Sequence, residues 1–197
     1  MNKYFLAVFS FLFVFLVFSC TTFPKSSSKP LSQTPSIYID AAGTKSAQQL
    51  FNFFISKNPN AKYEKVMQLA EYYIKECTIE GINSDVAFVQ MCLETGFLKF
   101  GGLVTENMNN FCGLGSIDKA NPGNTFETVL LGVRAHVQHL HAYGTTRELV
   151  QTLVDPRYKY VNPRGKAHTI QELAGTWASD QNYGKKLESL LLQLSVF

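Results

Sequence analysis

The chain has 197 residues, of which 46% are hydrophobic, and its formal net charge at pH 7 is +3. After removal of a short targeting segment, that length is enough for one domain with a sizeable core and hardly enough for two. The hydrophobic fraction excludes a chain that is disordered throughout. A nucleic-acid binder would carry a clustered basic stripe, which this sequence lacks, so we expect no nucleic-acid partner.

The N-terminus has the pattern of an export signal. Lys3 precedes an apolar run over residues 5–18, which is shorter than the ~20 residues that a membrane-spanning helix needs. The run ends in Val-Phe-Ser-Cys at residues 17–20, which resembles the lipobox of bacterial lipoproteins, where the cysteine is acylated and becomes the new N-terminus. We predict a signal peptide over residues 1–19 and a membrane lipid anchor at Cys20. An ordinary secretory signal or an uncleaved anchor is the alternative.

Residues 20–45 have the composition of a flexible tether. They are rich in Ser, Pro, Thr and Lys and contain few residues that can build a core. Such a tether lets a folded domain reach away from a membrane surface. We therefore expect the folded domain to occupy residues 46–197, as a monomer, on the periplasmic or extracytoplasmic face of the cell envelope.

Helical periodicity starts at Ser46, a suitable N-cap residue. A second helix is predicted over residues 63–80, with Gly81 as its C-terminal stop. Ser84 is the expected cap of a third helix, over residues 85–95, which is apolar on most sides and hence buried. Further helical segments are predicted at residues 128–143, after Thr146, at 169–179 and at 182–194.

Residues 96–126, which follow the third helix, carry a different pattern. The pairs Gly-Gly and Asn-Asn and the run Asn-Pro-Gly-Asn are typical of turns, and the short apolar pieces between them can form small strands at best. The predicted fold class is therefore mainly α (α+β), a helical domain with a small irregular or β-containing lobe directly after its most buried helix.

Glu94 stands near the C-terminal end of the apolar third helix. Apolar neighbours and the negative end of a helix dipole both disfavour an ionised carboxylate and so raise its pKa. General-acid catalysis at a glycosidic oxygen requires a carboxylic acid that stays protonated near neutral pH. Glu94 is therefore a candidate catalytic acid, although a glutamate at a helix end is more often a solvated surface residue.

Four segments occur in a characteristic order: Glu94-Thr-Gly-Phe-Leu-Lys-Phe-Gly, Asn109-Asn-Phe-Cys-Gly-Leu-Gly, Gly132-Val-Arg-Ala-His-Val-Gln-His-Leu and Trp177-Ala-Ser-Asp-Gln-Asn-Tyr-Gly. Together they resemble the glucosaminidase family of bacterial autolysins, glycoside hydrolase family 73, over roughly residues 63–194. The resemblance implies a lysozyme-like fold, no cofactor, and peptidoglycan glycan strands as substrate. It also implies cleavage of the β-1,4 bond on the reducing side of N-acetylglucosamine, with Glu94 as the general acid.

The same resemblance implies roles for further residues. Tyr183 matches the tyrosine of an Asp-x-x-Tyr block and is expected at the catalytic centre, with Asp180 of that block among the substrate-binding residues. Asn109, Asn110 and Phe111 match the Asn-Asn-aromatic turn of the family. They are expected to line the cleft and hold the sugar.

Other aromatic residues are open to two interpretations. Tyr158 and Tyr160 lie in a proline-bounded loop, where exposed aromatics stack on sugar rings or anchor the loop to the domain, so Tyr158 is a candidate substrate-binding residue. Trp177 has apolar neighbours at helical spacing and is predicted to be a core residue rather than a platform for sugar.

A second catalytic carboxylate has three candidates in the lobe, Glu106, Asp118 and Glu127. Glu127 is nearest to the expected place, although related sequences carry the acid one position later, where this chain has Thr128. The alternative requires no second acid, because the acetamido oxygen of the substrate can attack the anomeric carbon.

His136 and His139 are three residues apart on a predicted helix and share a face, a spacing that is compatible with two metal ligands. No carboxylate stands near them in sequence, so we expect packing and hydrogen-bonding roles and no metal. Arg134 is expected to pair with an acid in the cleft or on the surface. Cys77, Cys92 and Cys112 are interpreted as small buried apolar residues, with at most one disulfide.

Two rival functions remain open. A lytic transglycosylase uses one glutamate on the same fold but closes an anhydro ring instead of adding water. A peptidoglycan-binding lipoprotein would keep the sugar groove without turnover. The mass of the released saccharide distinguishes the first rival from a hydrolase, and the absence of new reducing ends distinguishes the second.

Overall fold

The computed structural model describes residues 34–197. The predicted signal peptide, the lipidation site at Cys20 and the first part of the tether lie outside these residues. Within residues 34–197, no helix combines the length and the apolar character needed to cross a bilayer.

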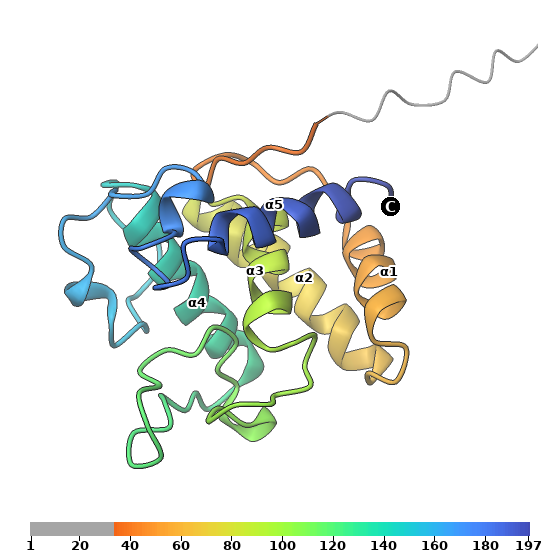
Figure 1. Cartoon of the computed structure of the whole chain (residues 1–197), viewed down its shortest axis with the longest axis horizontal. Helices are drawn as coiled ribbons and strands as arrows, with labels where there is room; N and C mark the ends of the chain where they lie inside the picture. Colours follow the sequence, from red (N-terminus) through yellow and green to blue (C-terminus); the bar gives the residue numbers. More distant parts are fainter. Residues whose placement is uncertain (1–33) are drawn as a thin grey trace, which may run out of the picture. The chain divides into compact units, whose positions relative to one another are not determined.

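The described part of the chain is mainly α-helical (Figure 1). Its five α-helices are α1 (Ala47–Lys57), α2 (Tyr63–Glu80), α3 (Ser84–Glu94), α4 (Val129–Gly144) and α5 (Tyr183–Leu194). Three short 3-10 helices are η1 (Glu106–Met108), η2 (Tyr158–Tyr160) and η3 (Gln171–Leu173). Two isolated β-bridges are the only strand-like pairings in residues 34–197, so of the two predicted forms of the lobe after α3, irregular or β-containing, the structure shows the irregular one.

The helix ends follow local capping chemistry. The side chain of Ser46 accepts a hydrogen bond from the backbone of Gln49, whose side chain bonds back to Ser46, a capping box that confirms the predicted start of α1. Gly81 ends α2 in the left-handed conformation, with φ 67°, as predicted. The N-cap of α3 is Asn83 rather than Ser84, because the Asn83 side chain accepts hydrogen bonds from the backbone N–H groups of Asp85 and Val86.

Helix α3 forms the centre of the domain and contacts each of the other four α-helices (Figure 1). Every residue from Ser84 to Cys92 is buried, which confirms the expectation from its apolar sequence. Aromatic rings fill the space around it, with Phe88 in edge contact with Tyr73 of α2 and Phe54 of α1. This burial fixes the helix whose last residue is Glu94.

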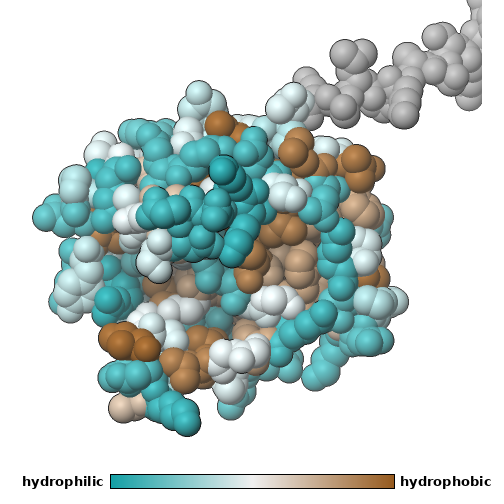
Figure 2. Space-filling model, in the orientation of Figure 1, coloured by the Kyte–Doolittle hydropathy of each residue, from teal (hydrophilic) through white to brown (hydrophobic). Residues whose placement is uncertain are grey.

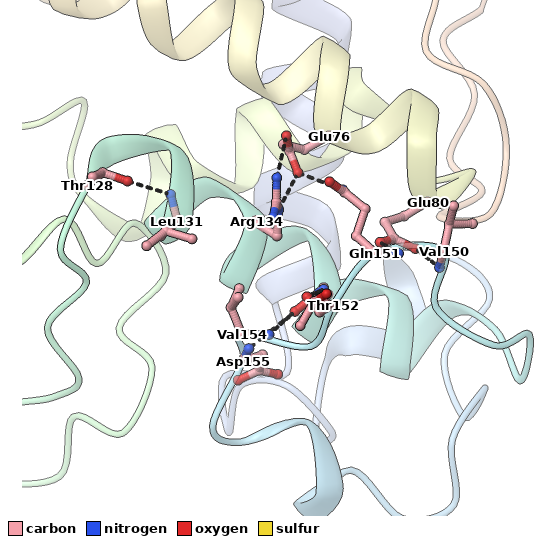
Figure 3. Close-up of polar contacts among 11 residues, drawn as sticks. Glu76, Glu80, Thr128, Leu131, Arg134, Val150, Gln151, Thr152, Val154 and Asp155 are labelled. Atoms are coloured by element: carbon pink, nitrogen blue, oxygen red, sulfur yellow. Dashed lines mark hydrogen bonds and ion pairs between the residues drawn. The ribbon is translucent and has the colours of Figure 1, made fainter.

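The segment after Thr146 is irregular and contains no helix before η2, so the helix predicted there is wrong. Figure 3 shows the reason, since the Glu80 side chain of α2 accepts hydrogen bonds from its backbone. The carboxylate of Glu80 accepts from the N–H groups of Val150 and Gln151 at 2.9 and 3.1 Å. The buried Glu76 pairs with Arg134 of α4 at 2.8 Å, so Arg134 is held by an acid of α2 and not by one in a cleft.

The helix predicted over residues 169–179 is also largely absent, and only η3 forms. The carbonyl of Leu173 accepts hydrogen bonds from the N–H groups of Trp177 and Ala178 at 2.9 and 3.2 Å, and Gly175 has a left-handed φ of 76°. The chain therefore makes a turn after η3 instead of continuing as a helix.

The last residues of the predicted tether pack on the domain. Ile39 is fully buried, its N–H donates to the carbonyl of His168 at 2.8 Å, and its carbonyl accepts from Asn83 at 2.8 Å. The backbone N–H of Thr44 donates to Asp85 at 2.8 Å. The folded domain thus begins before residue 46, and the predicted tether is too long at this end.

Candidate active site

Glu94, the last residue of α3, opens into a cavity of about 380 Å³. One wall of the cavity comes from the helices and the turn before α5, with Glu94, Trp177 and Tyr183, and we call it the helical wall. The opposite wall comes from the irregular lobe, and we call it the loop wall. It consists of Phe100, Gly101, Gly102, Leu103, Val104, Asn110, Cys112, Gly113 and Ser116.

Both hydrogen bonds to the Glu94 carboxylate reach the same oxygen. The indole Nε1 of Trp177 donates to Oε1 at 3.0 Å, and the hydroxyl of Tyr183 donates to Oε1 as well. Oε2 receives no hydrogen bond from residues 34–197. One oxygen is therefore fixed as an acceptor, and the other has no donor in the described residues.

The environment of Glu94 shifts its pKa upward. The carboxylate can meet solvent through the mouth of the cavity, yet protein atoms surround it on the other sides, and this burial raises its pKa. The hydrogen bonds from Tyr183 and Trp177 act in the opposite direction and offset part of the effect. A raised pKa increases the protonated fraction near neutral pH, which is the form that a general acid needs.

Tyr183, the first residue of α5, lies beside Glu94 with its hydroxyl buried. Burial and the nearby Glu94 carboxylate raise the pKa of this hydroxyl far above its usual value, so Tyr183 is a neutral donor. Its oxygen in turn accepts from Nε2 of Gln90 at 3.0 Å. The structure therefore brings together Glu94 and Tyr183, the two residues that the sequence motifs predict at one catalytic centre.

Trp177 belongs to the cavity, and its prediction as a plain core residue is wrong. The turn after η3 presents its indole N–H to Glu94, while its ring packs edge-on against His139 and tilted against Tyr143, with centroids 5.1 and 5.2 Å apart. Apolar neighbours at helical spacing were misleading because this segment is not a helix. The position of Trp177 at the start of the fourth resembling segment was the available signal.

The Asn-Asn-aromatic turn mostly builds the lobe. Only Asn110 lines the cavity, and its buried amide is used internally, since it donates to the carbonyls of Leu114 and Asn124 at 2.9 Å each. Phe111 is fully buried in the core, and Asn109 donates to the carbonyl of Phe126 at 3.0 Å. The prediction that all three side chains line the cleft is wrong for Asn109 and Phe111.

Two other predicted substrate-binding residues do not line the cavity. Asp180 pairs with Lys186 at 2.7 Å and accepts the backbone N–H of Asn182 at 2.8 Å, so it supports the start of α5. Tyr158 stacks on His141 and accepts a hydrogen bond from Arg164 at 2.6 Å. Of the two interpretations of Tyr158, the loop anchor is the one that these contacts favour.

Among residues 34–197, Glu94 is the only acidic residue that lines the cavity. Glu106 pairs with Lys65 at 2.9 Å, and that contact lowers its pKa. Asp118 accepts from the backbone of its own turn, which also lowers its pKa. Glu127 is exposed just before α4, and Thr128 is the N-cap of that helix. None of the three candidates for a second carboxylate faces Glu94 across the cavity.

The comparison with known proteins agrees with the site. The family model for glucosaminidases, described as mannosyl-glycoprotein endo-beta-N-acetylglucosaminidase, matches residues 70–195 and so includes both walls of the cavity. The chain belongs to the glucosaminidase family. An uncharacterized protein of Borreliella burgdorferi is 40% identical over 157 residues, which covers 80% of this chain and 76% of that protein. Family membership makes a glycosidase that acts on peptidoglycan the coarse functional class.

The histidines of α4 lie behind the glucosaminidase cavity. His136 contacts Gln90 at 3.0 Å and Tyr73 at 2.7 Å, and His139 pairs with the buried Asp155 at 2.7 Å. In residues 34–197, no three His, Cys, Asp or Glu side chains are grouped as metal ligands would be. The cysteines of this glucosaminidase domain are free and buried, as interpreted from the sequence: Cys77, Cys92 and Cys112.

A second cavity, of about 440 Å³, lies on the other side of the end of α3. It is lined by apolar side chains that include Leu93, Phe97 and Leu190, with Lys185 and Lys186 beside them. Figure 2 shows hydrophobic surface in the middle of this face, beneath α5. No acidic side chain of residues 34–197 lines this cavity, so the one beside Glu94 is the candidate active site of the glucosaminidase.

Proposed function

We propose that this glucosaminidase-family domain hydrolyses the β-1,4 bond on the reducing side of N-acetylglucosamine in peptidoglycan glycan strands. The observation that carries the proposal is the Glu94 carboxyl, which has a raised pKa, faces a cavity and accepts two hydrogen bonds on one oxygen. A general acid for glycosidic oxygen needs this environment. The family match gives the substrate class.

The two donors on Oε1 determine which oxygen carries the proton. Trp177 and Tyr183 occupy Oε1 with hydrogen atoms, so a proton on that oxygen would meet two other donors. The catalytic proton therefore resides on Oε2, the oxygen that has no hydrogen-bond donor within residues 34–197. From there it passes to the oxygen of the leaving sugar as the glycosidic bond breaks.

The cavity also bears on the second catalytic group. Since no other acid of residues 34–197 lines it, we propose that the acetamido oxygen of the substrate attacks the anomeric carbon while Glu94 protonates the leaving oxygen. Water then adds to the cyclic intermediate, and the Glu94 carboxylate takes a proton from that water. Glu94 thus acts first as acid and then as base.

The decisive experiment is digestion of purified peptidoglycan, borohydride reduction of the products and mass spectrometry. The proposal expects saccharides that end in reduced N-acetylglucosamine. Products that end in reduced N-acetylmuramic acid would assign the other glycosidic bond. Products lighter by one water, with no reducible end, would support a lytic transglycosylase. Binding of glycan strands without new ends would support a non-catalytic wall-binding protein.

We further propose that the domain is attached to a membrane through a lipid on Cys20. The support is the sequence alone, namely the apolar run that ends in the lipobox-like Val-Phe-Ser-Cys at residues 17–20. The native protein is expected to partition into the detergent phase, and Cys20→Ala should move it to the aqueous phase. A native protein found in the aqueous phase contradicts the anchor and leaves the enzymatic proposal intact.

A further inference from the structure

A chain of hydrogen bonds runs through the interior behind Glu94, from α5 across α3 and α4 to α2. The hydroxyl of Tyr183 accepts from Nε2 of Gln90 at 3.0 Å. Oε1 of Gln90 lies 3.0 Å from Nε2 of His136, and Nδ1 of His136 lies 2.7 Å from the hydroxyl of Tyr73. Gln90, His136 and Tyr73 are fully buried. Polar groups are costly in such a core unless each finds a partner, and here the chain provides the partners.

The protonation state of His136 determines which group donates and which accepts in each of these hydrogen bonds. Burial lowers the pKa of His136 to about 3, so the ring is neutral and has one donor and one acceptor nitrogen. The Tyr73 hydroxyl makes no second hydrogen bond within residues 34–197 and therefore donates to Nδ1. Nε2 then carries the hydrogen and donates to the oxygen of Gln90.

The direction continues to the catalytic carboxyl. With its oxygen occupied by His136, Gln90 turns its NH₂ group to Tyr183 and donates to the hydroxyl oxygen. The remaining hydrogen of that hydroxyl is then directed at Oε1 of Glu94. In the reverse direction, Tyr183 would donate to Gln90 instead, and Glu94 would lose one of its two donors. The hydroxyl hydrogen of Tyr73 would also be left without an acceptor in the described residues, which costs free energy.

We propose that Gln90, His136 and Tyr73 are positioning residues that hold the Tyr183 hydroxyl as a donor to Oε1 of Glu94. The inference rests on the proposed function for its catalytic meaning, since it keeps the transferable proton on Oε2. It also gives the third resembling segment, which contains His136, a role in the active site. The pair of histidines that resembled metal ligands serves instead to support the two donors, because His139 packs against Trp177.

The titratable groups around Glu94 do not change which group donates in each of these hydrogen bonds. Tyr183 faces Glu94 from α5 and Cys112 faces it from the lobe, and burial raises the pKa of each, so both are neutral. Tyr73 of α2, whose pKa is also raised by burial, and His139 of α4 are the neighbours of His136. His139 pairs with Asp155 and packs against Trp177, and its coulombic effect adds to burial in lowering the pKa of His136, which favours the neutral ring.

Loss of this chain of hydrogen bonds should raise the pKa of Glu94. A hydrogen bond from Tyr183 favours the ionised form of Glu94 and lowers its pKa, so a Tyr183 hydroxyl that turns away leaves the pKa higher. A hydrogen bond to a charged group corresponds to a shift of about one pH unit. The basic limb of the profile of activity against pH, where Glu94 loses its proton, should move to higher pH by that amount.

Trp177 permits a test that needs no turnover. It is the only tryptophan of the chain, and its N–H is bonded to Glu94, so its fluorescence should report the ionisation of that carboxyl. Fluorescence is recorded against pH on the full chain, and the transition that disappears in Glu94→Gln is the one assigned to Glu94. His136→Phe, which keeps a ring but no donor, should raise that midpoint by about one unit. His136→Gln, which keeps an N–H and an oxygen, should stay near the wild type.

Two further variants make the test robust. Tyr73→Phe keeps the packing and should produce a smaller upward shift, which serves if His136→Phe does not fold. In a Tyr183→Phe background, His136→Phe should produce no additional shift, because the chain acts only through the hydroxyl. An unmoved midpoint in His136→Phe or Tyr73→Phe overturns the inference, as does an equal shift in the Tyr183→Phe background. If the midpoints move as expected while peptidoglycan is not cleaved, the proposed function fails and the positioning chain stands.

Discussion

The two walls of the Glu94 cavity are built on different principles. On the helical wall, the donors Trp177 and Tyr183 converge on one carboxylate oxygen, and rings and hydrogen bonds of α3 and α4 support them from behind. On the loop wall, the amide of Asn110 donates its hydrogen bonds to backbone carbonyls of the same lobe, and glycines occupy three of the lining positions. The fixed hydrogen-bond donors of the helical wall thus face a loop wall made of backbone and mostly small or apolar side chains.

This difference indicates how the work is divided. The helical wall can fix a proton at one atom because its groups sit on elements that the core holds in place. The loop wall, which lacks an acid, can shape the space for a glycan strand but offers no carboxylate for the second step. The comparison therefore predicts large effects of substitutions on the helical wall and small ones elsewhere.

The largest effect is expected for Glu94→Gln, which should lower hydrolysis of peptidoglycan by about 10²–10⁴-fold because the proton donor is removed. The pKa of Glu94 is raised in the folded protein, so protonation of Glu94 stabilises the fold fully below its usual pKa of 4.5. This stabilisation is lost as the pH rises through the raised pKa of the folded state. The amide removes the unfavourable carboxylate, so the melting temperature at pH 7 should not fall. Glu106→Gln is the control and should keep wild-type activity. A Glu94→Gln protein with most of its activity would remove the central assignment.

The next effect concerns the second donor of the helical wall. Trp177→Phe keeps an aromatic ring on His139 but removes the hydrogen bond to Glu94, and should lower kcat/KM by about tenfold. The ionised carboxylate loses a donor, so the pKa of Glu94 rises and the basic limb of the pH profile moves to higher pH. A pH series of reducing-end assays measures both quantities. Reduced activity with an unmoved limb would indicate that the ring only packs.

A smaller effect is expected where the two walls join. Gly96 has a left-handed φ of 56° and begins a turn in which Phe97 and Leu98 are also left-handed, so the chain leaves α3 in a conformation that side chains disfavour. A Cβ at Gly96 meets no atom within 4 Å, and the cost of Gly96→Ala is therefore conformational, about 1 kcal/mol of unfolding free energy. Gly101→Ala, also in open space but without a positive φ, is the matched control and should be neutral in urea denaturation.

The smallest effect is expected for Glu127→Gln. Glu127 is exposed and does not line the cavity, so peptidoglycan hydrolysis should stay within about twofold of the wild type. A loss as large as that of Glu94→Gln would mean that Glu127 reaches the substrate, and it would contradict the proposal that the acetamido group replaces a second carboxylate.

Sequence patterns predicted the elements whose determinants are local. The capping box at Ser46, the stop at Gly81 and the apolar run of α3 each act within a few residues, and each is found in the structure. The helix predicted after Thr146 is absent because a distant group, the Glu80 carboxylate of α2, accepts hydrogen bonds from its backbone. No window of the local sequence contains Glu80, whereas the helix predicted over residues 169–179 gives way to a local turn at Leu173 and the left-handed Gly175.

The candidate site divides in the same way. The sequence by itself determined that an acid ends the most buried helix, since apolar periodicity and the following Gly96 are local properties. Only the tertiary structure decided what meets that acid, because Trp177 and Tyr183 lie 83 and 89 residues away along the chain and arrive through a turn and a helix start. Hydrogen bonds between such distant residues depend on the packing of α3 against α4 and α5, which places Gln90 and His136 behind the carboxyl.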